Sequence, residues 1–145
     1  MAALTNYAEN KIIDHLFRST AWSPAGPWYL ALFTATPSDT GGGTEVSGGS
    51  YARVSIAKGD STWNGTHGST TGASSGTTGT TSNAGTVTFP APTANWGVIT
   101  HVGICDAPSG GNLIAYGALT TAKTVNNGDP APVIDPGAFT FQVDN

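Results

Sequence analysis

The hydrophobic pattern of this chain changes its period once, shortly after residue 18. Before that point apolar residues recur every three or four positions, which places them on one stripe of a helix. We therefore expect an amphipathic helix over residues 4–18, capped by Thr5 or Asn6 and followed by the helix-breaking turn Trp22–Pro27. The stripe consists of Ala8, Ile12, Ile13, Leu16 and Phe17.

From Trp28 onward the pattern consists of short runs of β-branched and aromatic residues, separated by Gly, Pro, Asn and Ser. The fold class expected is mainly β: a single domain over residues 1–145, built as an antiparallel β-sandwich with one N-terminal helix. The expected strands are Tyr29–Thr34, Tyr51–Ala57, Thr86–Phe89, Val98–Asp106, Leu113–Leu119 and Phe139–Val143.

The run Val98–Asp106 is apolar on both of its predicted faces. Strict alternation puts Val98, Val102 and Ile104 on one face, and Ile99, Gly103 and Cys105 with His101 on the other. A strand covered on both sides lies in the middle of a sheet. We expect the facing sheet on one side, and on the other side the N-terminal helix or a partner subunit, with the helix favoured.

Residues 58–85 form an insertion whose larger part, Gly65–Gly85, is low-complexity sequence rich in Gly, Thr and Ser. Composition alone predicts a flexible linker. Two other interpretations are an assembly arm held by a neighbouring subunit, and an extended Thr-rich hairpin within the sandwich. For the arm, the candidate partner-binding residues are Thr70, Thr77 and Thr80.

Charge is scarce: 10% of the residues are charged and the net charge is -4. The five basic residues are scattered, which argues against a nucleic-acid partner. A neutral, hydroxyl-rich surface suits a protein that packs against neighbours. No signal peptide or membrane-spanning run is evident, so we expect synthesis in the cytoplasm and no membrane partner.

The candidates for catalysis are weak. Asp14 and His15 are adjacent on the predicted helix, so their side chains diverge. His101 and Cys105 share a strand face but lie about 13 Å apart along it, too far for a Cys/His pair. Cys105 is the sole cysteine, and the turn Asn126–Asp129 lacks the carboxylate spacing of a calcium loop. We expect a non-enzymatic protein with no cofactor and no metal.

Surface loops are the remaining candidates for function. Trp63 borders the polar insertion and is the best candidate for an intersubunit anchor, whereas Trp22 and Trp28 flank a turn and are expected to seal one end of the sandwich. The loop Thr36–Gly49 is a second candidate contact surface. From these regions we select Gly42, Glu45, Trp63 and Trp96 as partner-binding candidates.

Three segments carry a family resemblance: LTNYAENKIIDHLFR (Leu4–Arg18), the glycine-rich hinge between two strand motifs (Tyr29–Arg53), and GICDAPSGGNLIAYGALTTAKTV (Gly103–Val125). In these segments the chain resembles small structural proteins of tailed bacteriophages that are often labelled tail-fibre proteins. The resemblance implies a virion structural protein that binds itself, as a trimer or ring, and other virion proteins such as capsid or tail proteins.

A small domain without a coiled-coil or β-helical shaft makes a poor long fibre, so we expect a capsid decoration or cement module first. A tail-fibre or tail-tip component is the alternative. A carbohydrate-binding adhesin also stays open, with Trp63, Trp96 and Tyr51 stacking on the rings of a glycan receptor.

Overall fold

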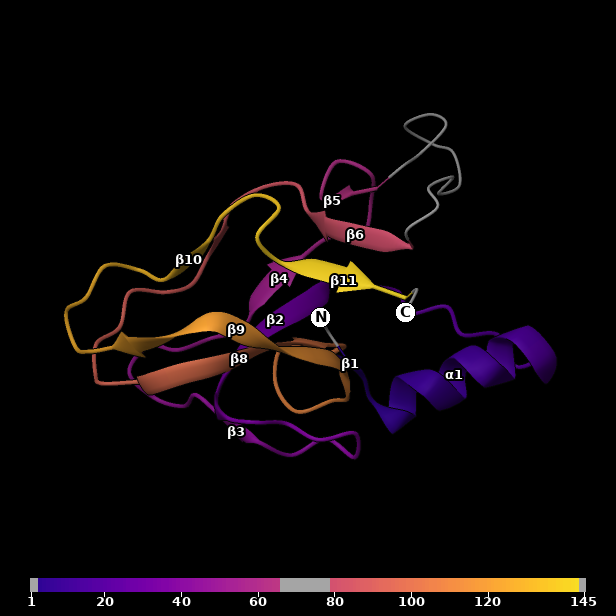
Figure 1. Ribbon diagram of the computed structural model, residues 1–145, viewed down its shortest axis with the longest axis horizontal. Helices are drawn as coiled ribbons and strands as arrows, with labels where there is room; N and C mark the ends of the chain where they lie inside the picture. The colour runs from indigo at the N-terminus through magenta and orange to yellow at the C-terminus, as the bar shows by residue number, and fades with distance from the viewer. Residues whose placement is uncertain (1–2, 66–78, 144–145) are drawn as a thin grey trace.

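A six-stranded antiparallel sheet lies at the centre of the computed structural model, which describes residues 3–65 and 79–143 (Figure 1). Its strands run in the order β1-β9-β8-β2-β3, and β4 also pairs with β2. The strands β2, β8 and β9 supply most of the pairing, because they are the long apolar runs. The bounds are β1 (Ala3–Leu4), β2 (Trp28–Ala35), β3 (Thr44–Glu45), β4 (Val54–Ile56), β8 (Gly97–Cys105) and β9 (Leu113–Val125).

Two small antiparallel sheets form the second layer. One has the strand order β11-β6-β5, and the other pairs β10 with β7. In Figure 1 the strands β6 and β11 lie along one side of the central sheet. The expected mainly-β, antiparallel, sandwich-like fold is thereby confirmed. The bounds are β5 (Trp63–Asn64), β6 (Thr80–Asn83), β7 (Val87–Thr88), β10 (Val133–Ile134) and β11 (Thr140–Gln142).

The hydrophobic core fills the space between these layers. Leu30, Val102 and Ile104 point into it from the central sheet, while Phe89 and Phe139 enter it from the other side. Tyr51 stacks on Phe89 and meets Trp96 edge to face, with ring centroids 6.4 and 5.3 Å apart. Burial of these aromatic and aliphatic side chains is the main stabilising contribution to the fold.

Asn83 links β6 to the C-terminal part of the chain by hydrogen bonds. Its side chain is buried, donates to the carbonyls of Gly85 and Asp135 at 2.8 Å each, and accepts the Phe139 amide at 2.9 Å. Since all of these partners lie in loops or strands of the folded body, residues 79–85 of the expected arm belong to that body. Residues 66–78, with Thr70 and Thr77, lie outside the described residues.

A register shift between β8 and β9 corrects the predicted face pattern. The pairing of β8 with β9 shifts register between Ile99 and His101, so strict alternation does not hold across this point. Ile99 is 2% exposed and belongs to the main core, whereas Val98 is 48% exposed. Ile104 and Val102 are buried together, as expected.

The helix α1 (Asn6–Phe17) does not cover the second face of β8, contrary to expectation. It contacts β1 and β9 and projects from one end of the sheets (Figure 1). Ala8 is its buried residue, while the rest of the apolar stripe is partly or largely exposed. Its N-cap residue, Thr5, donates its hydroxyl to the carbonyl of Leu113 rather than capping the helix.

The change of face at Ile99 can be tested with neighbouring substitutions on one strand. We expect Ile99→Asp to abolish soluble folding, because it buries an unpaired carboxylate. Val98→Asp should change the free energy of unfolding by about 0.5 kcal/mol or less, as is usual at exposed positions. Soluble yield, and urea unfolding followed by tryptophan fluorescence for the variant that folds, measure the two effects; the reverse order of tolerance would show that β8 alternates strictly.

Candidate functional site

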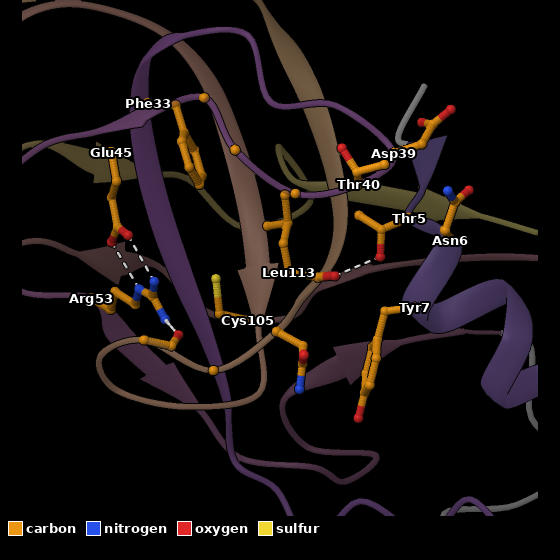
Figure 2. A pocket seen from close by; sticks show the side chains of 16 residues that line it. Thr5, Asn6, Tyr7, Phe33, Asp39, Thr40, Glu45, Arg53, Cys105 and Leu113 are labelled. Carbon is orange, nitrogen blue, oxygen red and sulfur yellow. Dashed lines mark hydrogen bonds and ion pairs between the residues drawn. The ribbon is translucent and has the colours of Figure 1, made fainter.

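A pocket of about 500 Å³ lies over the face of the central sheet that turns away from the main core (Figure 2). We call it the loop pocket. Its walls are three segments far apart in sequence: the start of α1, the loop after β2 and the loop between β8 and β9. They contribute Thr5–Tyr7, Asp39–Gly43 and Gly110–Leu113, respectively.

The floor of the loop pocket is a small apolar cluster. Phe33 and Cys105 are buried on adjacent strands, and Leu113 packs beside them. Burial raises the pKa of the Cys105 thiol from its ordinary 9.0 to about 11. At neutral pH the sulfur is therefore a protonated thiol and a poor nucleophile.

One side of the loop pocket is held by the ion pair of Arg53 with Glu45. The guanidinium donates to both carboxylate oxygens at 2.8 and 2.7 Å, and also to the carbonyls of Ala107 and Gly110 at 2.7 and 2.8 Å. The Arg53 side chain is 9% exposed. Its hydrogen bond to Glu45 raises the pKa of Arg53, so its charge is permanent.

Glu45 is shared with a tyrosine of the core. The Tyr51 hydroxyl donates to Glu45 Oε1 at 3.0 Å and accepts the Leu32 amide at 2.9 Å. Burial is the main reason that the pKa of Tyr51 lies far above its ordinary value. The network thus connects the loop after β2 to the sheet itself.

Two glycine-rich loops, the one between β8 and β9 and the one after β2, have backbone conformations that require glycine. Asp106 accepts both the backbone amide and the side-chain amide of Asn112, at 2.7 and 2.8 Å. Between them Gly111 has φ +68°, and a Cβ there would lie 2.4 Å from the Asp106 carboxylate. Gly43 has φ +77° and no room for a Cβ against Pro37. Glycine is therefore required at both positions.

The third wall is the start of α1, which hydrogen bonds hold against the loop after β2. The backbone amide of Asn6 donates to the backbone carbonyl of Asp39 at 2.8 Å, and the Asp39 carboxylate accepts the Tyr116 hydroxyl at 3.0 Å. Figure 2 shows Thr5, Asn6 and Tyr7 on the side of the pocket opposite Arg53 and Glu45. The pocket is thus walled on both sides by hydrogen-bonded segments.

A second hollow of about 420 Å³ is mainly apolar and lies between α1 and the sheet of β5, β6 and β11. We call it the α1 groove. Trp22 and Trp28 meet there edge to face, 6.4 Å between centroids, and Trp63 packs against Phe139 at 6.2 Å. Its main apolar lining is Leu4, Ile12, Trp22, Trp28, Trp63 and Phe141.

The structure separates the partner-binding candidates. Gly42 and Glu45 line the loop pocket, while Trp63 lines the α1 groove, half-buried, with its indole N–H donating to the Ala57 carbonyl at 3.0 Å. Thr80 is exposed at the start of β6. Trp96 is 5% exposed and donates to the Gly49 carbonyl, so its ring belongs to the core and offers no stacking face.

Tyr51, with its ring among Phe89 and Trp96, is likewise used by the fold, so the proposed stacking trio is not assembled. The sequence reasoning missed Arg53, Asn112 and Tyr7. Arg53 carried a detectable signal, because it is one of only five basic residues and lies in an otherwise strand-like segment.

Residues 3–65 and 79–143 contain neither a metal-binding cluster nor a membrane-spanning helix. Nowhere in those residues do three His, Cys, Asp or Glu side chains gather in a way that could hold a metal ion. No helix in the same part of the chain is long and apolar enough to cross a membrane.

The buried Cys105 thiol and Tyr51 hydroxyl predict that the folding stability decreases at alkaline pH. Burial raises the folded-state pKa of Cys105, which favours the protonated thiol. The contribution of this thiol to folding stability is therefore complete below pH 9 and is lost as the pH rises toward 11. We expect Cys105→Ala to lessen this decline in urea unfolding at successive pH values. A smaller decline should remain because Tyr51 is also buried. Identical pH profiles for the two proteins would contradict the burial of the thiol.

Comparison with known proteins agrees with a structural role. The family described as "Podophage GP4 fiber I protein gp80" matches residues 3–142, and no curated protein matches the chain. This match takes in the central sheet, α1 and the segments that form both hollows. The chain therefore belongs to the podophage GP4 fiber I protein gp80 family.

Proposed function

We propose that this protein is a non-enzymatic structural subunit of a podophage tail fibre that assembles with further copies of itself through α1 and the α1 groove. Family membership supports a fibre component over the decoration or cement module expected from composition. Assembly into the virion after synthesis in the host cytoplasm follows from this role. The whole described chain then acts as one domain.

The observation that carries the proposal is the exposed apolar stripe of α1. Ile13, Leu16 and Phe17 are 44, 64 and 81% exposed. Scattered surface apolar residues need no explanation, but a contiguous apolar surface marks an interaction site. Here the stripe adjoins the tryptophan-lined groove, because Ile12 belongs to both.

The shape of this surface favours a second copy as its occupant. At 100° per residue, Ile12, Leu16, Ile13 and Phe17 span about 140° of the helix circumference. That width is typical of a helix that packs against another element. A symmetric contact between identical subunits brings two such stripes together, and antiparallel α1 helices would also align their dipoles favourably.

Weak charge repulsion supports the same conclusion. With 10% charged residues and a net charge of -4, two copies approach each other at little electrostatic cost. Most soluble oligomers are closed homo-oligomers. A dimer, trimer or ring would each satisfy the proposal, provided that α1 lies in the contact.

Substitution on α1 tests this role. We expect the wild-type chain to self-associate in sedimentation equilibrium, and the double variant Leu16→Glu/Phe17→Glu to be monomeric. Both residues are exposed and Glu is a good helix former, so the fold should be kept.

The matched control adds the same two charges elsewhere, as Thr120→Glu/Thr121→Glu on the exposed part of β9. This variant should associate like the wild type. A monomeric wild-type chain, or an α1 double variant that still associates, would refute self-assembly through α1.

A further inference from the structure

We infer that the loop pocket binds one ring of a neutral saccharide. This inference rests on the pocket itself and does not depend on self-association through α1. The glycan alternative expected from the sequence relied on Trp63, Trp96 and Tyr51; the site inferred here uses different residues on another face.

The size and rigidity of the pocket suit a small ligand. Its volume of about 500 Å³ falls in the range of small-molecule sites, which is roughly 300–1,000 Å³. The Arg53 bonds to Ala107 and Gly110 and the Asp106 bonds to Asn112 hold one wall in place without a ligand. A preformed pocket loses little conformational entropy on binding.

The lining combines an apolar surface with hydrogen-bonding groups, which is the combination a sugar ring requires. Leu113 and the half-buried ring of Tyr7 offer a surface for the C–H face of a sugar, although the Lys11 ammonium lies over one face of that ring, 5.7 Å from its centroid. Asp39, Thr40 and Asn112 carry acceptors and donors for its hydroxyls. A carboxylate accepts about four hydrogen bonds, so the bond from Tyr116 leaves Asp39 able to accept others.

The charges of the lining disfavour an anionic ligand. The Arg53 guanidinium is already engaged by Glu45 and two carbonyls. Asp39 then leaves the lining with a net negative charge. A phosphate or an acidic sugar would therefore be repelled, whereas uncharged hydroxyls are favourable partners for Asp39.

The test uses the full chain and four neutral probes: the methyl glycosides of glucose, galactose, rhamnose and N-acetylglucosamine. Titration to millimolar concentration is followed by amide chemical shifts. We expect at least one probe to shift the amides of Gly41–Gly43 and Gly110–Asn112. In Tyr7→Ala and in Asp39→Asn the affinity for that probe should fall at least about tenfold, while Tyr7→Phe should retain it.

Phe17→Ala is the control, because it removes an exposed aromatic ring outside the pocket; it should leave saccharide binding unchanged. The amide spectrum of each variant shows whether the fold is kept, and Asp39→Asn provides the test if Tyr7→Ala is unfolded. No shifts with any probe, or shifts confined to Trp22, Trp28 and Trp63, would overturn the inference. Neither result bears on self-association, which is measured separately.

Discussion

The ion pair between Arg53 and Glu45 is the constraint on which the functional face of this protein depends. Arg53 binds the loop between β8 and β9 through the carbonyls of Ala107 and Gly110, while Glu45 lies in β3, at the end of the loop after β2. Removing one partner would leave the other charge unpaired; because the Glu45 side chain is 27% exposed, the cost is below the about 3–5 kcal/mol typical of a fully buried pair. In this protein Glu45 also holds Tyr51, so the pair links the pocket wall to the core. The loop after β2 is held in addition by the Asp39 carboxylate, which accepts the Tyr116 hydroxyl of β9.

This arrangement places two surfaces of different chemistry on one small fold. The α1 groove and the α1 stripe are apolar and tryptophan-rich, whereas the loop pocket is lined by amides, hydroxyls and carboxylates. The start of α1 is shared, since Leu4 lines the groove while Thr5 and Tyr7 line the pocket. A fibre subunit has to attach to its neighbours and still present a surface outward. In the proposed subunit the α1 groove would serve the first requirement and the loop pocket the second, and apart from the start of α1 the two are lined by different residues.

Local sequence patterns accounted for α1 and for the long strands of the central sheet, since their periodicity is set by residues close in the chain. They could not reveal the register shift beside Ile99, because it is decided by the pairing partner in β9. Nor could they find the two-residue strands such as β1, which exist through long-range pairing. The helix was predicted correctly but placed wrongly, because its stripe shows that it is amphipathic and not what it packs against. The scarcity of basic residues marked Arg53 as unusual, but its partners could not be predicted, since two of its four hydrogen bonds go to backbone carbonyls that leave no trace in side-chain patterns.

The central claim, that the protein is a subunit of the tail rather than of the capsid surface, is tested most directly by its copy number in purified particles. A decoration protein repeats with the capsid lattice, whereas a fibre subunit occupies the few symmetry-related positions of a tail. Quantitative mass spectrometry against the major capsid protein and the tail proteins measures this ratio. The account predicts an amount comparable to that of the tail proteins and far below that of the capsid protein. An amount equal to that of the major capsid protein would contradict it.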